Sequence, residues 1–189
     1  MSSSHLNEHA KPQDPIETMQ TIKKLLLSRA YWLVVALSGA ALLAVALYYQ
    51  HVLGDEPCQV CIQLRVWVAA FALLAVVMIW APPQRWLQLS ASILLFVCGA
   101  GVAERSFNLY QIENGRGEGS CEFFLGYPDW FALDKWIPEV FEVRNLCGYT
   151  PEMFYGLSMA ESLLLTGIAI CLVAGSTAIL WASERQHWR

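Results

Sequence analysis

The stretch from Ala30 to Tyr49, AYWLVVALSGAALLAVALYY, decides the fold, because its 20 residues include no charged side chain. An α-helix rises about 1.5 Å per residue, so about 20 apolar residues cross the roughly 30 Å hydrocarbon core of a membrane. Three more apolar runs follow, at Val66–Trp80, Trp86–Ala103 and Ser162–Ala182. Continuous runs favour helices over a barrel, so the sequence predicts an all-α, integral membrane four-helix bundle.

The composition agrees with a membrane protein. Of the 189 residues, 56% are hydrophobic and only 15% are charged, whereas soluble domains have roughly 45–50% and about 25%. So few charges cannot cover the surface of a soluble globule that contains four such helices. The hydrophobicity excludes a disordered chain. The net charge of −4 argues against a nucleic-acid partner, since such proteins usually carry a basic surface.

The apolar runs divide the chain into a membrane domain and two tails. Residues 1–29 are predicted to form a polar cytoplasmic tail, residues 30–182 the membrane domain, and residues 183–189 a second tail. Extended by their flanks, the spans are expected at residues 30–49, 62–81, 86–105 and 161–182. Two connections on the outer side then cover residues 50–61 and 106–160.

The basic residues predict the orientation, because Lys and Arg in short flanks accumulate on the cytoplasmic side. Seven lie in the tails and in the turn between the second and third spans: Lys11, Lys23, Lys24, Arg29, Arg85, Arg185 and Arg189. The opposite side carries three: Arg116, Lys135 and Arg144. We therefore expect both termini in the cytoplasm and both outer loops on the opposite, outward face of the membrane.

Six cysteines are the candidate chemical groups: Cys58, Cys61, Cys98, Cys121, Cys147 and Cys171. Cys98 and Cys171 lie in the middle of predicted spans, where a free cysteine behaves as a small apolar residue. The other four fall on the outer side, and disulfides persist in oxidising compartments such as the periplasm. The natural pairs are Cys58 with Cys61 and Cys121 with Cys147.

The motif Cys58-Gln-Val-Cys61 lies at the start of the second span. As a structural staple it would do little, because a small loop hardly restrains the unfolded chain. Half of a four-cysteine zinc site is a second alternative, although no other CxxC or suitably spaced His accompanies it. Reversible thiol exchange is the interpretation that we favour. Arg65 follows Cys61 by one helical turn, where it could lower the thiol pKa or act as an interfacial anchor.

Cys121 and Cys147 lie in the long outer loop, and two interpretations stay open for them. A disulfide that closes a loop of this size can add about 3–4 kcal/mol of stability, so a structural role is common. Beside an outward CxxC, redox activity becomes the favoured interpretation. Glycines at 115, 117 and 119 precede Cys121, and a flexible chain gives a partner thiolate access to the sulfur.

The same loop contains an amphipathic segment at residues 128–141. Trp130, Leu133, Ile137 and Val140 recur at the helical period. The segment is too short to span the membrane, and Pro138 would kink it. We expect a short helix that lies in the membrane surface and holds the loop near the CxxC. Packing against the end of the bundle is the alternative, and the two are compatible.

Electrons released by two thiol pairs need an acceptor. Ile62 follows Cys61, so the chain has no CxxCH haem motif, and it has no dinucleotide fingerprint or iron–sulfur spacing. A lipid-soluble quinone needs no motif and reaches a membrane protein through the bilayer. Elimination therefore suggests a quinone, either ubiquinone or menaquinone.

With these motifs the sequence resembles a known family, the DsbB family of quinone-dependent thiol oxidases of the bacterial inner membrane. The resemblance runs from about Tyr31 to Trp181 and rests on Gln50-His51, Pro57-Cys58-x-x-Cys61-Ile62, Arg65, the spacing of Cys121 and Cys147, Asp134-Lys135-Trp136-Ile137-Pro138 and Gly156-Leu157. Together these motifs are specific, whereas a single CxxC would not be.

The resemblance implies a path for the electrons. A periplasmic DsbA-like protein would attack Cys121, and Cys147 could then exchange with Cys58. The pair Cys58–Cys61 would reduce the quinone, with Cys61 nearest the ring. Arg65 matches the quinone-binding arginine of the family, and Gln50 falls close to the quinone pocket.

Two features depart from the family pattern, and they leave alternatives open. Residues 108–119 contain no His, although some members place a polar ring near the quinone from that part of the chain, and the N-terminal tail is long. A specialised DsbI-like paralogue with a dedicated partner is one alternative. A non-enzymatic scaffold, in which the disulfides only staple the outer loop, is another. A carrier that delivers reductant outward would need cysteines on the cytoplasmic side, where we expect none.

Overall fold

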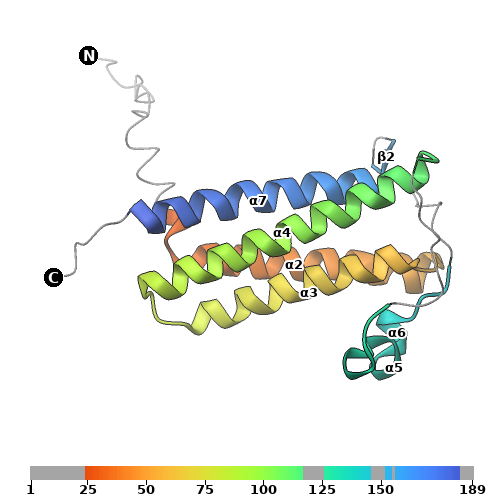
Figure 1. The fold of residues 1–189 in the computed structure, drawn as a ribbon, viewed down its shortest axis with the longest axis horizontal. Coiled ribbons are helices and arrows are strands. Elements are labelled where there is room, and N and C mark those ends of the chain that lie inside the picture. Colours follow the sequence, from red (N-terminus) through yellow and green to blue (C-terminus); the bar gives the residue numbers. More distant parts are fainter. Residues whose placement is uncertain (1–23, 117–125, 146–151, 155, 184–189) are drawn as a thin grey trace, which may run out of the picture.

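A computed structural model describes residues 24–116, 126–145, 152–154 and 156–183. Its long helices are α2 (Arg29–Tyr48), α3 (Gln59–Trp80), α4 (Arg85–Glu113) and α7 (Met159–Ser183). Figure 1 shows these four lying side by side, each antiparallel to the one before. All four are long and apolar enough to cross a membrane. The predicted all-α membrane bundle is therefore confirmed, although α4 continues beyond residue 105, where we expected the third span to end.

The shorter elements gather at one end of the bundle. A π-helical turn, η1 (Tyr49–Leu53), continues α2, and the outer loop carries η2 (Asp129–Phe131), α5 (Leu133–Trp136) and α6 (Pro138–Phe141). A small antiparallel hairpin of β1 (Glu152–Phe154) and β2 (Leu157–Ser158) precedes α7. The chain therefore concentrates its irregular structure where the CxxC motif also lies.

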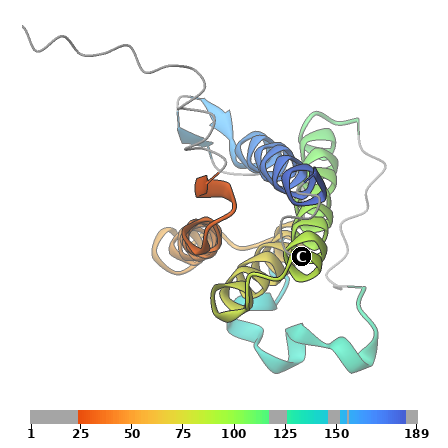
Figure 2. The same cartoon turned by 90° about the vertical axis from the view of Figure 1, so that its left-hand side faces the viewer.

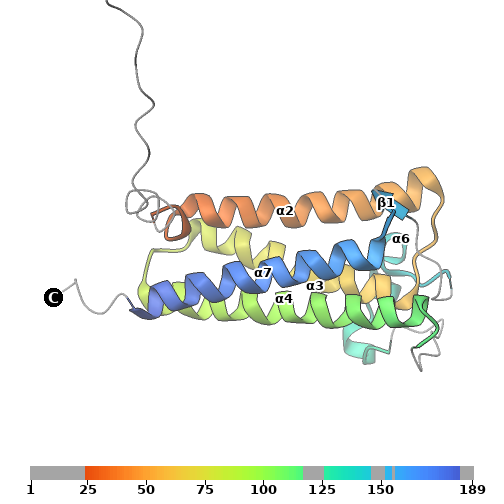
Figure 3. The same ribbon diagram turned by 90° about the horizontal axis from the view of Figure 1, so that it is seen from above.

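The long helices form a ring in chain order. Helix α2 packs on α3, α3 on α4, and α4 along much of α7, and the end-on view in Figure 2 shows the same order. From above, α7 lies along α4 while α2 runs to one side (Figure 3). Among the described residues, α2 and α7 lack the broad packing of the other neighbours. The ring is thus loosest between its first and last helices.

Glycines allow the closest helix contacts. A Cβ on Gly39 of α2 would lie 2.8 Å from the Cβ of Ala72 on α3. A Cβ on Gly167 of α7 would lie 2.7 Å from the backbone nitrogen of Ala103 on α4. Both distances are too short for real atoms, so only glycine permits these approaches. Small residues at helix contacts are typical of membrane bundles, where packing replaces the hydrophobic effect.

The outward faces of the helices are apolar. Large hydrophobic side chains that are at least half exposed occur on all four helices: Leu33, Val34, Leu37, Leu73, Val77, Ile93, Leu94, Leu165, Leu172 and Ile179. Patches of this extent are rare on soluble monomers. A hydrocarbon environment around the bundle explains them.

Polar side chains connect the helices inside the bundle. The indole Nε1 of Trp32 donates to Oε1 of Gln88 at 2.7 Å, which links α2 to α4. At the end of the bundle away from the CxxC, Arg85 donates to the carbonyls of Trp181 and Ala182 at 3.0 and 2.9 Å. These are orphan carbonyls at the end of α7, and a cation there also complements the helix dipole.

Helix α7 begins with a capping box. The amide of Glu161 donates to Oγ of Ser158 at 3.3 Å, and the amide of Ser158 donates to Oε2 of Glu161 at 3.1 Å. The Ser158 hydroxyl also donates to Oε2 of Glu113 at 3.1 Å. The start of α7 is therefore fixed against the end of α4.

The amphipathic segment is helical, as predicted, but it forms three short segments instead of one helix. The chain leaves the helical conformation at Ile137 (φ −139°, ψ 70°), because the residue before a proline disfavours it. Trp130 and Trp136 are 77% and 61% exposed. Val140 is half-buried, and Ala132 is buried. Indole rings at the surface and a partly buried underside suit both a membrane surface and the end of the bundle.

Candidate thiol–disulfide site

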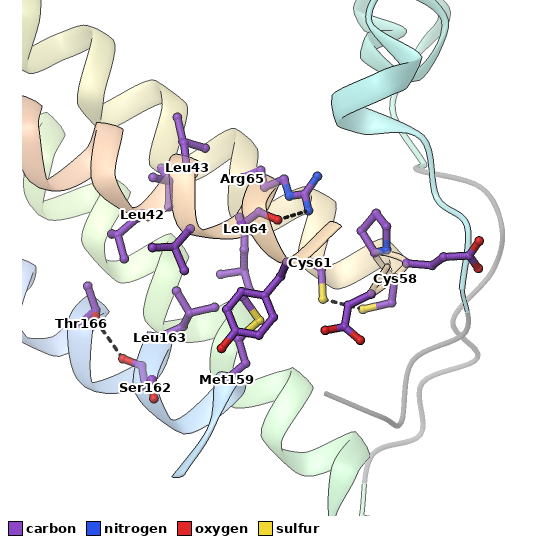
Figure 4. Close-up of a pocket in the computed structure, with 17 residues that line it drawn as sticks. Leu42, Leu43, Cys58, Cys61, Leu64, Arg65, Met159, Ser162, Leu163 and Thr166 are labelled. Carbon is purple, nitrogen blue, oxygen red and sulfur yellow. Dashed lines mark hydrogen bonds between the residues drawn. The ribbon is translucent and has the colours of Figure 1, made fainter. Parts of the chain in front are cut away.

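The two cysteines of the CxxC motif lie at the start of α3. Cys58 is the N-cap residue, with extended backbone, and Cys61 lies in the first turn. Side chains three residues apart on a helix share a face, and the two Sγ atoms lie 2.9 Å apart (Figure 4). Both cysteines are free thiols. The pair is close enough to form a disulfide with little movement, since the bond itself is about 2.05 Å long.

The surroundings of Cys58 make its thiol more acidic than an ordinary cysteine thiol. A hydrogen bond from the Cys61 thiol lowers the pKa of Cys58 to about 7, against the opposing effect of burial, and backbone N–H groups of the first turn add to the lowering. Thiolates are the nucleophiles of disulfide exchange. Cys58 is therefore suited to exchange near neutral pH.

A cavity of about 260 Å³ opens beside Cys61, between α2, α3 and α7. Its walls are mostly aliphatic and include Leu42, Leu43, Val45, Leu64, Val68 and Leu163. Two hydroxyls in the wall are already paired: that of Ser162 donates to the carbonyl of Ser158, just before α7, at 3.1 Å, and that of Thr166 donates to the carbonyl of Ser162 at 2.8 Å. Figure 4 shows this wall facing the cysteine pair. The cavity therefore suits an apolar ring better than a charged solute.

Arg65 supplies a cation at the cavity. It lines the cavity, and its side chain is only 7% exposed. Nη1 donates to Oε1 of Gln50 at 2.5 Å and to the carbonyl of Val140 at 2.8 Å, and Nη2 donates to the carbonyl of Ala46 at 3.3 Å. A guanidinium has five N–H donors. Within the described residues, Nε and one Nη2 hydrogen therefore keep capacity for a further acceptor.

Gln50 accepts a hydrogen bond from Arg65 but does not itself line the cavity. Its side chain is 9% exposed, in the π-helical turn that ends α2. Its Nε2 donates to the carbonyl of Glu139 at 2.9 Å. The structure thus brings together four of the six predicted site residues, with Gln50 one hydrogen bond removed from the cavity.

The outer loop reaches the cysteine pair through its backbone. The amides of Arg144 and Asn145 donate to the carbonyl of Pro57 at 3.0 and 3.3 Å, and Asn145 pairs with Cys58 in an isolated parallel bridge. The other two predicted cysteines, Cys121 and Cys147, lie outside the described residues. Cys147 follows Asn145 by two positions in the sequence.

Several site residues were missing from the sequence prediction. Met159, Ser162, Leu163 and Thr166 form the α7 wall of the cavity. Their spacing of three and four marks one helix face, but no feature of the sequence says which helix that face meets. In the loop before Cys58, Asp55 also lines the cavity. Within the described part of the chain, no group of three or more His, Cys, Asp or Glu side chains could hold a metal ion.

Fold and site together define a class: a multi-pass membrane protein with a pair of thiols at one end of a four-helix bundle. Comparison with known proteins gives the family. The family model described as "Disulfide bond formation protein DsbB" matches residues 28–177. The chain belongs to this DsbB family, and the resemblance seen in the motifs is confirmed.

Individual relatives cover most of the chain. It is 35% identical over 163 residues to "Disulfide bond formation protein B 2" of Pseudomonas aeruginosa, and the aligned region covers 85% of this chain and 96% of the relative. It is 32% identical over 150 residues to a "Disulfide bond formation protein B" of Shewanella amazonensis, and this alignment covers 78% of this chain and 88% of the relative. A Yersinia pestis protein of the same name is 31% identical over 160 residues, covering 82% and 89%. The chain is thus a membrane protein of disulfide bond formation.

Proposed function

We propose that this protein is a quinone-dependent thiol oxidase that reoxidises a periplasmic DsbA-like dithiol protein. The observation that carries the proposal is the position of Cys58 and Cys61, 2.9 Å apart, in the wall of an apolar cavity that Arg65 also lines. Thiols alone would allow exchange with another protein. Thiols beside an apolar cavity with a buried cation suit the transfer of electrons to a lipid-soluble acceptor.

The cavity fits a quinone by its chemistry. Its aliphatic walls match an apolar ring, and the uncommitted N–H groups of Arg65 can donate to a carbonyl oxygen. Ubiquinone and menaquinone both present such a carbonyl. When bound, either would accept two electrons and two protons. Cys61 lines the cavity beside Arg65, so its sulfur is the one that we assign to the acceptor.

The proposed reaction conserves electrons and protons. The DsbA-like dithiol reduces a Cys121–Cys147 disulfide and becomes oxidised, leaving two thiols in the outer loop. Cys147 then attacks Cys58 of the oxidised pair, and Cys121 attacks Cys147, which restores the loop disulfide and leaves Cys58 and Cys61 reduced. Loss of two electrons and two protons joins Cys58 to Cys61 again. The bridge between Cys58 and Asn145 supports the exchange, because it brings the chain that leads to Cys147 alongside Cys58.

The energetics favour this acceptor. DsbA has a reduction potential near −120 mV, so an ordinary disulfide cannot reoxidise it. Each 30 mV corresponds to about 1.4 kcal/mol for two electrons. A membrane quinone offers a stronger oxidant in the same compartment.

We also propose the orientation predicted by the basic residues. Both termini lie in the cytoplasm, and the end of the bundle that carries Cys58 faces the periplasm. Arg85, counted on the cytoplasmic side, lies at the end of the bundle away from the CxxC and contacts the last turn of α7. This arrangement supports the proposal, because it separates the basic end from the thiol end.

A turnover assay tests the function. Purified protein, a soluble quinone and a reduced DsbA-like protein are mixed, and quinone absorbance is followed for the original chain, Cys61→Ser and Cys98→Ser. We expect quinone reduction in the original chain and in Cys98→Ser, because Cys98 lies on α4 outside the cavity lining. Cys61→Ser should fall to the background rate. Equal rates in Cys61→Ser and the original chain would refute the electron path.

The scaffold alternative makes a different prediction in the same assay. If the disulfides only staple the outer loop, a reduced DsbA-like protein will not bleach the quinone with any variant. The cysteines will also resist mild reductants. A DsbI-like paralogue would reduce quinone with its dedicated partner but not with a general DsbA-like protein.

A further inference from the structure

Helix α6 ends in two carbonyls that helices of the bundle satisfy. Helix α6 is a single turn, and within it the amide of Glu142 donates a hydrogen bond to the carbonyl of Pro138 only. The last carbonyls of a helix have no partner within it. Those of Glu139 and Val140 instead accept hydrogen bonds from Gln50 on η1 and Arg65 on α3.

These two donors also hold each other. Nη1 of Arg65 donates to Oε1 of Gln50, so the Gln50 amide uses its oxygen toward Arg65 and its nitrogen toward Glu139. Both side chains are at least nine-tenths buried. A cation at the C-terminal end of a helical turn is also favoured electrostatically. The arrangement is a closed set of hydrogen bonds, which we call the Gln50–Arg65 latch.

The latch attaches α6 to the bundle, and the backbone hydrogen bonds of Arg144 and Asn145 to Pro57 attach the residues that follow. In the described residues, α5 and α6 pack on each other, and no long helix packs broadly against either. Figure 1 shows both helices beside the bundle, below its right-hand end. Four residues beyond Phe141, Asn145 pairs with Cys58. The placement of residues 142–145 beside the cysteine pair therefore depends on where α6 is held, together with the amide hydrogen bonds of Arg144 and Asn145 to Pro57.

We propose that Gln50 is a positioning residue, and that the Gln50–Arg65 latch sets the alignment of the outer loop with Cys58. The proposal rests on the proposed function, because it assigns to Gln50 the step in which the two cysteine-bearing loops meet. Arg65 serves two sites through different N–H groups. Nη1 holds α6, while Nε and one Nη2 hydrogen have no acceptor among the described residues.

A cross-linking experiment tests the alignment without any electron acceptor. Position 145 receives a thiol through Asn145→Cys, in a chain that also carries Cys61→Ser, Cys121→Ser and Cys147→Ser. Paired strand residues lie about 4.8 Å apart, within the Cα separation that disulfides accept. We measure how fast oxidised glutathione joins positions 58 and 145, with Gln50 intact and with Gln50→Met. Methionine keeps the size of the side chain and removes both hydrogen bonds.

The expected result is a cross-linking rate about tenfold lower with Gln50→Met. Gln84→Met is the matched control, since Gln84 is exposed in the turn before α4, and it should leave the rate unchanged. Equal rates with Gln50→Met and Gln84→Met would overturn the proposal.

Two further measurements keep the proposal falsifiable. Amide hydrogen exchange on the unmodified chain needs no variant to fold, and we expect protected amides at Arg144 and Asn145. Exchange there as fast as in a free peptide would contradict the alignment of this segment with Cys58, on which the proposal rests. In turnover, Gln50→Met should slow the reaction with a reduced DsbA-like protein more than the reaction with dithiothreitol; equal slowing would contradict a role in loop alignment. Absence of quinone turnover in the unmodified chain would refute the proposed function but not the cross-linking result.

Discussion

Cys58 occupies a position that suits a nucleophile. It is the N-cap residue of α3, next to the backbone N–H groups of the first turn, and the Cys61 thiol donates a hydrogen bond to it. Both interactions stabilise the thiolate, which is why the pKa of Cys58 lies near 7 instead of its usual value. Burial acts in the opposite direction but does not prevail.

The lowered pKa predicts how Cys58 reacts with iodoacetamide. In the reduced protein, its alkylation rate should rise about tenfold per pH unit below pH 7 and level off above, because only the thiolate reacts. Cys61→Ala removes the thiol donor and should move the midpoint up toward the ordinary value of about 8.5. Mass spectrometry of each cysteine at several pH values measures both. A midpoint near 8.5 in the unmodified chain, or no movement in Cys61→Ala, would contradict the assignment.

For single residues, the sequence predicts which side chains form the site when their partners lie close by in the chain. Cys58, Cys61 and Arg65 are separated by three and four residues, so a single helix start brings them together. Gln50 could be named from the family motif, but its hydrogen bonds to Arg65 and the Glu139 carbonyl depend on how the loop folds back. Backbone carbonyls carry no side-chain signal, so no sequence pattern points to such a partner.

Among the described elements, α4 and α7 share the most extensive helix contact. Gly167 approaches the backbone of Ala103, and a Cβ on Gly99 would lie 2.8 Å from the side chain of Ile170. In lipid, close packing of this kind takes the place of hydrophobic burial. The α4–α7 contact is therefore sensitive to an added methyl group.

A pair of glycine substitutions on α7 tests this sensitivity. Gly167→Ala should lower the unfolding free energy in detergent by about 1–3 kcal/mol, since the added Cβ would overlap Ala103. Gly175→Ala is the control, because its Cβ would meet only Phe96, at 3.8 Å. Both changes raise helix propensity equally, so the difference reports the contact. Thermal denaturation of both variants measures it, and equal stability would contradict the close approach.

The sequence predicts the elements themselves well, for a physical reason. Four apolar runs must be helices in lipid, because no other open structure satisfies their backbone there. The end of α4 at Glu113 was harder to predict, since a helix can continue past the membrane where polar residues follow. The loop helices also follow from periodicity and Pro138, but their attachment to the bundle does not.

At the scale of the whole molecule, the two ends of the bundle differ in chemistry. One end carries the cysteine pair, the cavity and the loop helices, and the other carries the short turn before Arg85. The proposed orientation places the thiols on the oxidising side of the membrane. Disulfide chemistry requires this placement, because the cytoplasm keeps thiols reduced.

Labelling with a membrane-impermeant maleimide tests the orientation. In a chain whose six cysteines are replaced by Ser, His51→Cys and Gln84→Cys place single thiols at exposed positions near opposite ends of the bundle. With the outer membrane permeabilised, we expect labelling of His51→Cys in intact cells, and of Gln84→Cys only after the inner membrane is broken. The reverse pattern would overturn the orientation, and labelling of both in intact cells would contradict a bundle that crosses the membrane.

The loose contact between α2 and α7 has a consequence for how the proposed acceptor must be measured. The cavity lies between α2, α3 and α7, and Val45 in its wall is 37% exposed, so we expect the cavity to open toward the hydrocarbon layer through the loose α2–α7 contact. A ligand that arrives sideways from that layer partitions first into lipid or micelle. The concentration that matters for binding is then the mole fraction of the ligand in the lipid or detergent phase. Adding detergent at a constant total amount of ligand lowers this mole fraction, so the cavity should become less saturated.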